Sequence, residues 1–346
     1  MHNTHPFWNS WRTLMRVGLL AVFWLLSALL SSAQAGLVLD TTQVEQALAR
    51  GAVLWDARSA ADYAQGHIPG AVNLGSVGDV FRDPHREDPP SAAVASLLFG
   101  RAGMDILNRD VVVYATQGDP YAYFAARMIE YYGGPHAKVY HGGIDAWKSA
   151  GKPLSQQVTT LPPVTLNLTQ ERVGTLWTQD VIERVRAGGA QIVDTRTPKE
   201  FSGEDIRAIR GGHIQGAISI PYESNWQDPA AALKLASRQV SHREGMALKQ
   251  QNDLRALYAK LDPEKETVVY CQSGVRASET AVILRDLGFT RVKVYEPSWL
   301  GYAGVLNAPA ENEVFVNVGA INGQISALQG KLRTLEAELA KLQPRH

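Results

Sequence analysis

The sequence is poor in cysteine, with a single one, Cys271, among 346 residues. One cysteine cannot pair within the chain, which excludes a framework of intrachain disulfides. The chain also lacks a charge excess, since 34 lysines and arginines balance 34 aspartates and glutamates without a long basic or acidic run. This balance argues against nucleic acid and anionic membrane surfaces as partners.

No acidic residue occurs before Asp40, and the N-terminal segment differs from the rest of the chain. Arg12 and Arg16 precede an apolar run at 17–30, which is followed by small residues and an Ala-x-Ala site ending at Ala35. This pattern predicts a cleaved signal peptide over 1–35 and therefore a periplasmic or otherwise exported protein. The alternative is an uncleaved anchor that leaves the protein facing the periplasm.

If the protein is exported, its single unpaired cysteine suggests a functional thiol. A free thiol in an oxidising compartment is a hazard unless it has a function, although a buried, inert cysteine is the simpler alternative.

The length suits two domains, and internal repeats divide the chain accordingly. Residues 52–72 and 190–218 share a hydrophobic run, Asp-x-Arg and Gly-His-Ile-x-Gly-Ala, and residues 111–118 match 267–274. Each copy alternates β-branched runs with amphipathic segments, which predicts an α/β fold of two parallel sheets flanked by helices. The expected segments are domain 1 at 36–155, a linker at 156–172, domain 2 at 173–306 and a tail at 307–346.

The second copy places Cys271 directly after a predicted strand, in the loop Cys271-Gln272-Ser273-Gly274-Val275-Arg276. A helix is expected to begin near Ala277, so the sulfur lies beside a helix N-terminus, where N–H groups and the dipole favour an anion. The reactive thiolate is stabilised in such a place.

These motifs together resemble the rhodanese superfamily, specifically tandem-domain thiosulfate/3-mercaptopyruvate sulfurtransferases. The resemblance covers about 37–305 and rests on the two Asp-x-Arg and Gly-His-Ile-x-Gly-Ala segments, the Cys271 loop and Tyr-Glu-Pro-Ser-Trp at 295–299. It implies that Cys271 attacks a small anionic sulfur donor, holds the sulfur as a persulfide and passes it to a thiol or cyanide. No metal or cofactor is implied. The implied substrate-binding residues are Arg276, Arg196, Gln272, Ser273, Gly274 and Val275.

Several of these side chains have structural alternatives. Arg196 could pair with Asp194 and only hold the loop. His213 is expected to close a turn rather than to carry a proton, while Trp226 and Trp299 either wall the pocket or, more in keeping with their type, pack in the core.

The first copy departs from the pattern at the decisive position. Ala115 stands opposite Cys271, and Asp119 follows in the same loop, where its charge would repel an anionic donor. Domain 1 is therefore expected to be an inactive scaffold.

Two other functions could use a cysteine in such a loop. A cysteine phosphatase needs five residues between cysteine and arginine, whereas here four intervene between Cys271 and Arg276. A non-enzymatic sulfur-binding or adaptor protein remains the main alternative, because fold alone does not prove activity. The physiological donor stays open, since the loop combines features of thiosulfate and 3-mercaptopyruvate users.

The tail carries a heptad pattern that the resemblance does not cover. Its apolar residues alternate steps of three and four between 318 and 342, which predicts a coiled-coil helix. Gly323 and Gly330 weaken such a helix. Self-association, docking on a partner's helix and packing on the chain's own domain are the alternatives for this surface. The seam residues are Val318, Ile321, Ile325, Leu328, Leu332, Leu335, Leu339 and Leu342.

Overall fold

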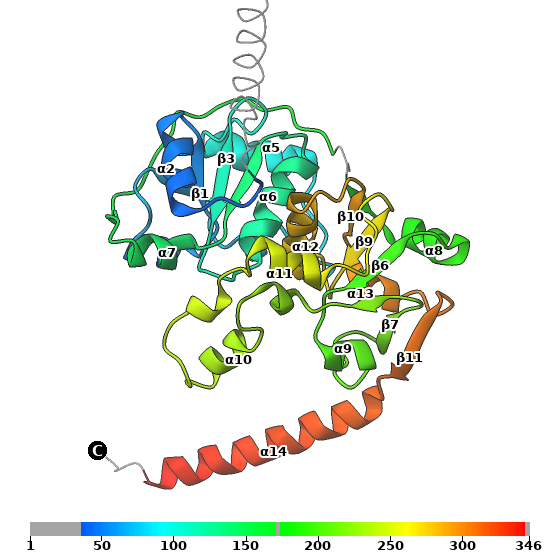
Figure 1. Cartoon of the computed structure of the whole chain (residues 1–346). Coiled ribbons are helices and arrows are strands. Elements are labelled where there is room, and N and C mark those ends of the chain that lie inside the picture. The colour runs from blue at the N-terminus through cyan, green and yellow to red at the C-terminus, as the bar shows by residue number, and fades with distance from the viewer. Residues whose placement is uncertain (1–35, 171–173, 343–346) are drawn as a thin grey trace, which may run out of the picture.

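The computed structural model describes residues 36–170 and 174–342, so the predicted signal peptide lies outside the described residues. Within these two ranges, no helix has the length and apolar composition needed to cross a membrane. The chain forms two α/β domains, joined by an irregular segment and followed by a long helix (Figure 1).

Domain 1 contains a parallel sheet of four strands in the order β2-β1-β3-β4. Alternate residues of β3 enter two separate hydrophobic clusters, with Val111 and Val113 in one and Val112 and Tyr114 in the other. Both faces of the sheet are therefore buried, as the continuous apolar strands indicate. The strands are β1 (Val53–Asp56), β2 (Ala71–Asn73), β3 (Val111–Tyr114) and β4 (Ala137–Tyr140). The helices are α2 (Thr41–Ala49), α3 (Ala60–Gln65), α4 (Val77–Val80), α5 (Ala92–Arg101), α6 (Tyr121–Tyr131) and α7 (Gly143–Ser149).

Domain 2 repeats this design in a parallel sheet of five strands, ordered β5-β10-β9-β6-β8. Its central strand β9 is buried on both faces, because Val269 enters one cluster while Val268 and Tyr270 enter another. The predicted fold class is thus confirmed. The strands are β5 (Thr175–Leu176), β6 (Gln191–Asp194), β8 (Ile218–Ser219), β9 (Thr267–Tyr270) and β10 (Val292–Tyr295). The helices are α8 (Thr178–Ala187), α9 (Pro198–Ser202), α10 (Ala231–Ala236), α11 (Gln251–Leu257), α12 (Val275–Asp286) and α13 (Ser298–Ala303), with 3-10 turns η1 (Tyr222–Asn225) and η2 (Glu244–Met246).

A separate antiparallel pair, β7 (Arg210–Ile214) with β11 (Ala310–Phe315), extends domain 2. We expected the tail to begin at residue 307, but its first part pairs with β7 and belongs to the domain. The segment Ala-Glu-Asn-Glu-Val-Phe is mostly exposed and acidic, so its composition does not indicate a strand.

The two domains pack through α6 and α12 (Figure 1). Val275 and Val282 of α12 enter the hydrophobic cluster of domain 1, and Arg285 pairs with Glu130 at 2.8 Å across the interface. The connecting segment also packs on domain 1, where Leu168 is buried. The helix that follows the Cys271 loop is therefore held from both domains.

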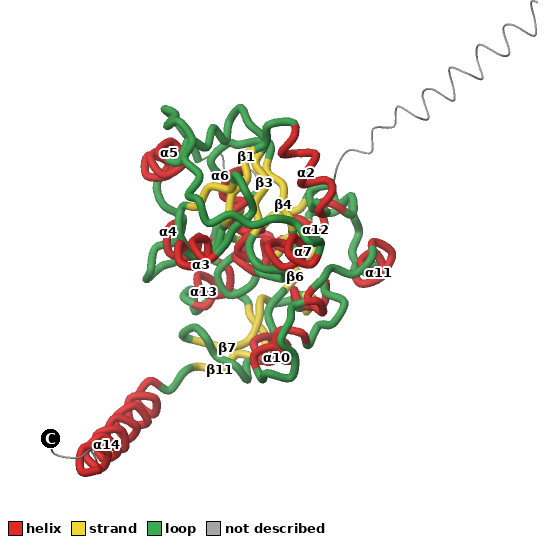
Figure 2. The backbone as a smooth tube through the Cα atoms, turned by 90° about the vertical axis from the view of Figure 1, so that its left-hand side faces the viewer, coloured by secondary structure: helices red, strands yellow, loops and turns green. Residues whose placement is uncertain are grey.

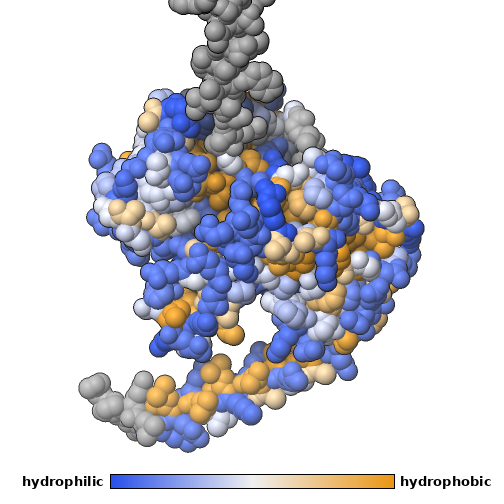
Figure 3. Space-filling model, in the orientation of Figure 1, coloured by the Kyte–Doolittle hydropathy of each residue, from blue (hydrophilic) through white to orange (hydrophobic). Residues whose placement is uncertain are grey.

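The last helix, α14 (Val318–Leu342), extends away from both domains (Figures 1 and 2). Figure 3 shows apolar side chains gathered along one side of it. Each described member of the predicted seam is at least 43% exposed, so this apolar surface is not covered by the chain's own domains.

Candidate active site

Cys271 lies at the carboxyl end of the central strand β9, immediately before α12. The loop between them ends at Gly274, which caps α12 with φ +84°. A Cβ at this position would lie 2.9 Å from the carbonyl oxygen of Glu296, so the close approach and the positive φ both require glycine. The Cys271 residue is 1% exposed and its thiol is free.

The first turn of α13 holds two carbonyl groups of this loop. The amide of Trp299 donates to the carbonyl oxygen of Cys271 at 3.0 Å, and the amide of Leu300 donates to that of Gln272 at 2.9 Å. Both carbonyl groups are thereby directed toward α13.

The helix α12 holds a third carbonyl group, because Ser278 Oγ donates to the Gly274 oxygen at 2.8 Å. The amides of Gln272, Ser273 and Gly274 donate to no acceptor within the described ranges. A loop with bound carbonyls and unused N–H groups at a helix N-terminus can stabilise an anion. A thiolate or persulfide on the preceding residue is such an anion.

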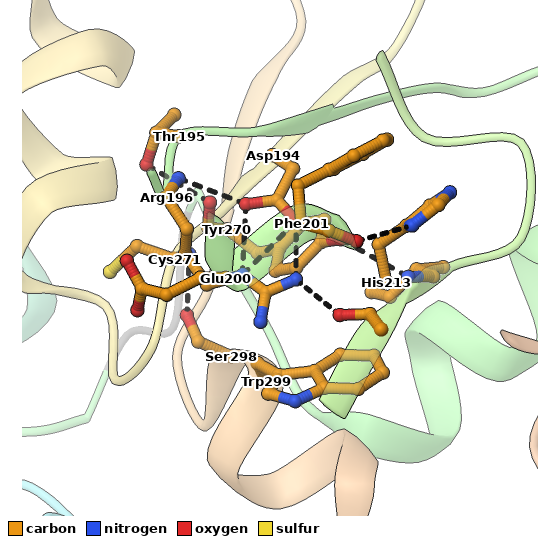
Figure 4. Close-up of polar contacts among 12 residues, drawn as sticks. Asp194, Thr195, Arg196, Glu200, Phe201, His213, Tyr270, Cys271, Ser298 and Trp299 are labelled. Carbon is orange, nitrogen blue, oxygen red and sulfur yellow. Dashed lines mark hydrogen bonds and ion pairs between the residues drawn. The ribbon is translucent and has the colours of Figure 1, made fainter. Parts of the chain in front are cut away.

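Ser298 supports the same loop from β10 and α13. Its Oγ accepts a hydrogen bond from the amide of Cys271 at 3.2 Å (Figure 4). The same Oγ donates to the carbonyl oxygen of Tyr295 at 2.8 Å. Ser298 has φ +49°, which is uncommon for a residue other than glycine. The strained position places its hydroxyl group below the cysteine.

Arg276 forms a bidentate ion pair with Glu200, at 2.7 and 2.8 Å. Burial raises the pKa of Glu200, but the hydrogen bond and charge of Arg276 outweigh burial and lower it from 4.5 to about 2. Burial lowers the pKa of Arg276, while the Glu200 hydrogen bond and the negative charge of Cys271 more than offset this effect and raise it. Arg276 is thus held by Glu200, and contact between Arg276 and a substrate stays a prediction.

Arg196 has a different environment. It donates to both oxygens of Asp194 and, at 2.7 Å, to the carbonyl oxygen of Gly212, and its guanidinium lies over the ring of Trp299 (Figure 4). Arg196 is 1% exposed. These contacts favour the structural alternative, and contact between Arg196 and a substrate stays an untested prediction.

Two of the remaining loop side chains, those of Gln272 and Val275, make contacts elsewhere. Gln272 Nε2 donates to the carbonyl oxygen of Arg207 at 2.7 Å, and Val275 packs into the cluster of domain 1. Ser273 is half-buried. Gln272 and Val275 could therefore contact a substrate only through their backbone amides.

His213 and the two tryptophans are buried and pack against neighbouring side chains. His213 Nδ1 contacts the carbonyl oxygen of Phe201 at 2.9 Å, and the two rings stack at 3.6 Å. Trp226 and Trp299 are each 1% exposed and belong to hydrophobic clusters.

A known protein family matches two segments of the chain. Residues 40–150 and 178–304 match the family model described as the rhodanese-like domain. The chain belongs to this family.

Known proteins similar to this rhodanese-like chain cover most of its length. A thiosulfate sulfurtransferase of Corynebacterium glutamicum is 33% identical over 264 residues, which are 72% of this chain and 81% of that protein. The structure of a 3-mercaptopyruvate sulfurtransferase from Leishmania major is similar with a TM-score of 0.65 and 22% identity, covering 80% of this chain and 76% of that one. An anaerobic ergothioneine biosynthesis enzyme from Chlorobium limicola has a TM-score of 0.62 and 21% identity; the match covers 76% of this chain but spans less than two thirds, 64%, of that one. The two structural likenesses show the fold.

The first rhodanese-like domain repeats the loop geometry without the nucleophile. Ala115 follows β3 as Cys271 follows β9, and Gly118 has φ +77° where Gly274 has φ +84°. Burial raises the pKa of Asp119 in this loop. With a methyl group in place of the thiol, this loop offers no atom that could carry sulfur at that position.

Glu200 and Ser298 are site residues that the sequence did not reveal. Thr197 and Glu200 form a capping box at the start of α9, a signal for a helix but not for a partner of Arg276. Among the described residues, no group of three or more histidine, cysteine, aspartate or glutamate side chains is placed to hold a metal ion.

The Glu200–Arg276 pair predicts a pH-dependent stability. The pKa of Glu200 is depressed in the folded state, so the pair stabilises the fold above about pH 4.5 and loses this effect as the pH falls to about 2. We expect Glu200→Gln to lower the free energy of unfolding by on the order of 3 kcal/mol near neutral pH. Urea titrations of both proteins between pH 7 and 2 should give values that converge at the acid end. A difference that stays constant across this range would contradict the assignment.

Proposed function

We propose that this chain is a sulfurtransferase in which Cys271 accepts a sulfur atom from thiosulfate as a persulfide and passes it to a thiol or cyanide. The observation that carries the proposal is the position of the sole thiol, at the N-terminus of α12 beside unused loop amides and Arg276. Relatives named thiosulfate sulfurtransferase, about 30% identical over most of the chain, support the same donor.

The reaction proceeds in two displacements. The Cys271 thiolate attacks the outer sulfur of thiosulfate, the sulfur–sulfur bond breaks, and sulfite leaves with the electron pair. An acceptor thiolate or cyanide then attacks the terminal sulfur of the persulfide and restores the thiolate. Both bound species are anionic, so preorganised amides and a fixed cation lower the barrier without moving during the reaction.

3-Mercaptopyruvate is the second candidate donor. Arg276 favours the doubly charged thiosulfate, whereas Ser273 and Gly274 are loop residues of the type expected for 3-mercaptopyruvate users. A non-enzymatic sulfur-binding role would leave the same loop unused in turnover. Release of thiocyanate from thiosulfate and cyanide by the purified protein distinguishes an enzyme from an adaptor. Export of the mature chain, expected from residues 1–35, stays part of this proposal.

The tail adds a partner to the proposal: α14 pairs with α14 of a second copy as a parallel coiled coil. In heptad register the seam has Val318 and Ile325 at early a positions and leucine at the later d positions, the preference of two-stranded coils. In a parallel pair Lys331 at g faces Glu336 at e of the partner helix, with opposite charges. Each described seam residue is exposed and available for this contact.

Replacing the nucleophile tests the chemistry. We expect Cys271→Ser to abolish turnover without lowering the melting temperature, because serine has nearly the shape of cysteine but cannot form a persulfide. Intact-mass measurement after incubation with thiosulfate should show one added sulfur atom on the wild type and none on the variant. Comparable turnover by the variant would refute the proposed mechanism.

The donor is tested at Arg276. Removal of Arg276 alone would leave the buried carboxylate of Glu200 with only the exposed Arg207 as an ion partner, at 3.3 Å, so Glu200→Gln serves as the background. In that background we expect Arg276→Thr to raise the KM for thiosulfate by about tenfold or more, the loss of one charge-assisted contact. The KM for 3-mercaptopyruvate, which carries one carboxylate, should rise less. Equal effects in steady-state assays would mean that Arg276 only shapes the loop.

The coiled coil is tested by solution mass. Removal of 317–346 keeps β11 and its contact with β7, and we expect this variant to be monomeric by light scattering at micromolar concentration while the full chain is dimeric. Leu335→Asp, which places a charge in the seam, should also give monomers, whereas the matched change Ala337→Asp on the outer face should not. Thiocyanate production should be the same in all four proteins. A monomeric full-length protein would contradict the proposal.

A further inference from the structure

One side chain of the inactive domain reaches the catalytic loop. Arg82 follows α4 in domain 1, is 8% exposed, and donates from Nη2 to the carbonyl oxygen of Ser273 at 2.5 Å. Ser273 lies two residues after Cys271. Among the described contacts, the loop carbonyls of residues 271 and 272 accept hydrogen bonds from α13, and that of residue 274 accepts one from α12. The carbonyl of Ser273 is the one of these four that accepts from domain 1.

Arg82 belongs to a buried charged cluster at the domain interface. Glu296, 1% exposed, forms an ion pair with Arg127 of α6, and its other oxygen lies 3.7 Å from Arg82 Nη1. Both guanidiniums also lie over the ring of Phe124, at 4.9 and 5.2 Å. Glu87 contacts Arg82 at 3.2 Å but is 39% exposed, so water screens its charge. Two buried cations thus share one buried carboxylate next to the loop.

The cluster is not fully satisfied by the protein itself. Arg82 Nε and Arg127 Nη1 are buried and donate to no acceptor among the described residues. A Cβ on Gly274 would lie 3.5 Å from Glu296 Oε2 and 3.6 Å from Arg127 Nη2, so both members of this ion pair approach the loop, with Arg82 as the second cation beside them. Excess buried positive charge at this distance favours a negative charge on the loop.

We infer that Arg82 is a positioning residue for sulfur transfer: the catalytically inactive first domain completes the active site by turning the Ser273 carbonyl outward and adding positive charge behind the loop. The inference rests on the proposed function. With the carbonyl of Ser273 released, its oxygen could turn toward the sulfur and repel the anion, while the amide of Gly274, in the same peptide group, would turn away. The second rhodanese-like domain would then keep its thiol but lose part of its anion site.

Single-turnover formation of the persulfide tests this role. Wild type and variants are mixed with saturating thiosulfate, quenched at intervals and analysed by intact mass. We expect Arg82→Met to lower the maximal rate about tenfold or more, since a hydrogen bond from a charged donor is lost. Arg82→Lys keeps a cationic donor and should recover the rate to within about threefold of wild type. If the Arg82→Met protein does not fold, Arg82→Gln, a smaller change, replaces it. The rate of Arg82→Gln should be lower than that of Arg82→Lys.

The matched control is Arg285→Gln. It removes another arginine ion pair between the domains, the one with Glu130, which does not touch the loop. Its rate should stay within about twofold of wild type, because an exposed pair contributes little. An equal loss in Arg82→Met and Arg285→Gln, or a rate for Arg82→Met within twofold of wild type, would overturn the role of Arg82. Absence of persulfide in the wild type would instead refute the proposed function.

Discussion

The stability of an anionic sulfur in a buried loop depends on whether the N–H or the C=O side of each neighbouring peptide group faces it. In domain 2 the carbonyls of the loop are bound by α13, α12 and Arg82, whereas the amides of Gln272, Ser273 and Gly274 donate to no acceptor among the described residues. Gly274 permits the turn, and Glu296 fills the space behind it. The positions of β9, β10 and the domain interface together fix the orientation of these loop carbonyls.

Comparison of the two copies distinguishes contacts that maintain the fold from residues expected to take part in the chemistry. In both copies an arginine two residues after the aspartate donates to that aspartate and to a glycine carbonyl: Arg58 to Asp56 and Gly66, Arg196 to Asp194 and Gly212. In each copy, the tyrosine at the end of the neighbouring strand in the sheet accepts a hydrogen bond from the amide of an isoleucine. These repeated contacts maintain a fold, which explains why they persist in the domain that has Ala115. The cysteine occurs only in the second copy, although Arg82 of the first copy contacts the loop that carries it.

Sequence patterns predicted the features that depend on local order along the chain. Buried parallel strands appear as short apolar runs, and the Cys271 loop is contiguous, so both could be read directly. The Glu200–Arg276 pair joins residues 76 positions apart, and Arg82 lies 191 positions from Ser273, so neither contact leaves a local signal. The polar strand β11 was missed because it is an exposed edge whose pairing with β7 is decided by the tertiary structure.

In the proposed persulfide, the amides of the loop rather than its carbonyls surround the transferred sulfur. A crystal structure of the protein treated with thiosulfate tests it most directly. The account predicts a sulfur atom about 2.05 Å from Cys271 Sγ, with the amides of Gln272, Ser273 and Gly274 directed at it and the Ser273 carbonyl still bound to Arg82. An unmodified Cys271, or a persulfide that faces the carbonyl groups of the loop, would contradict the account.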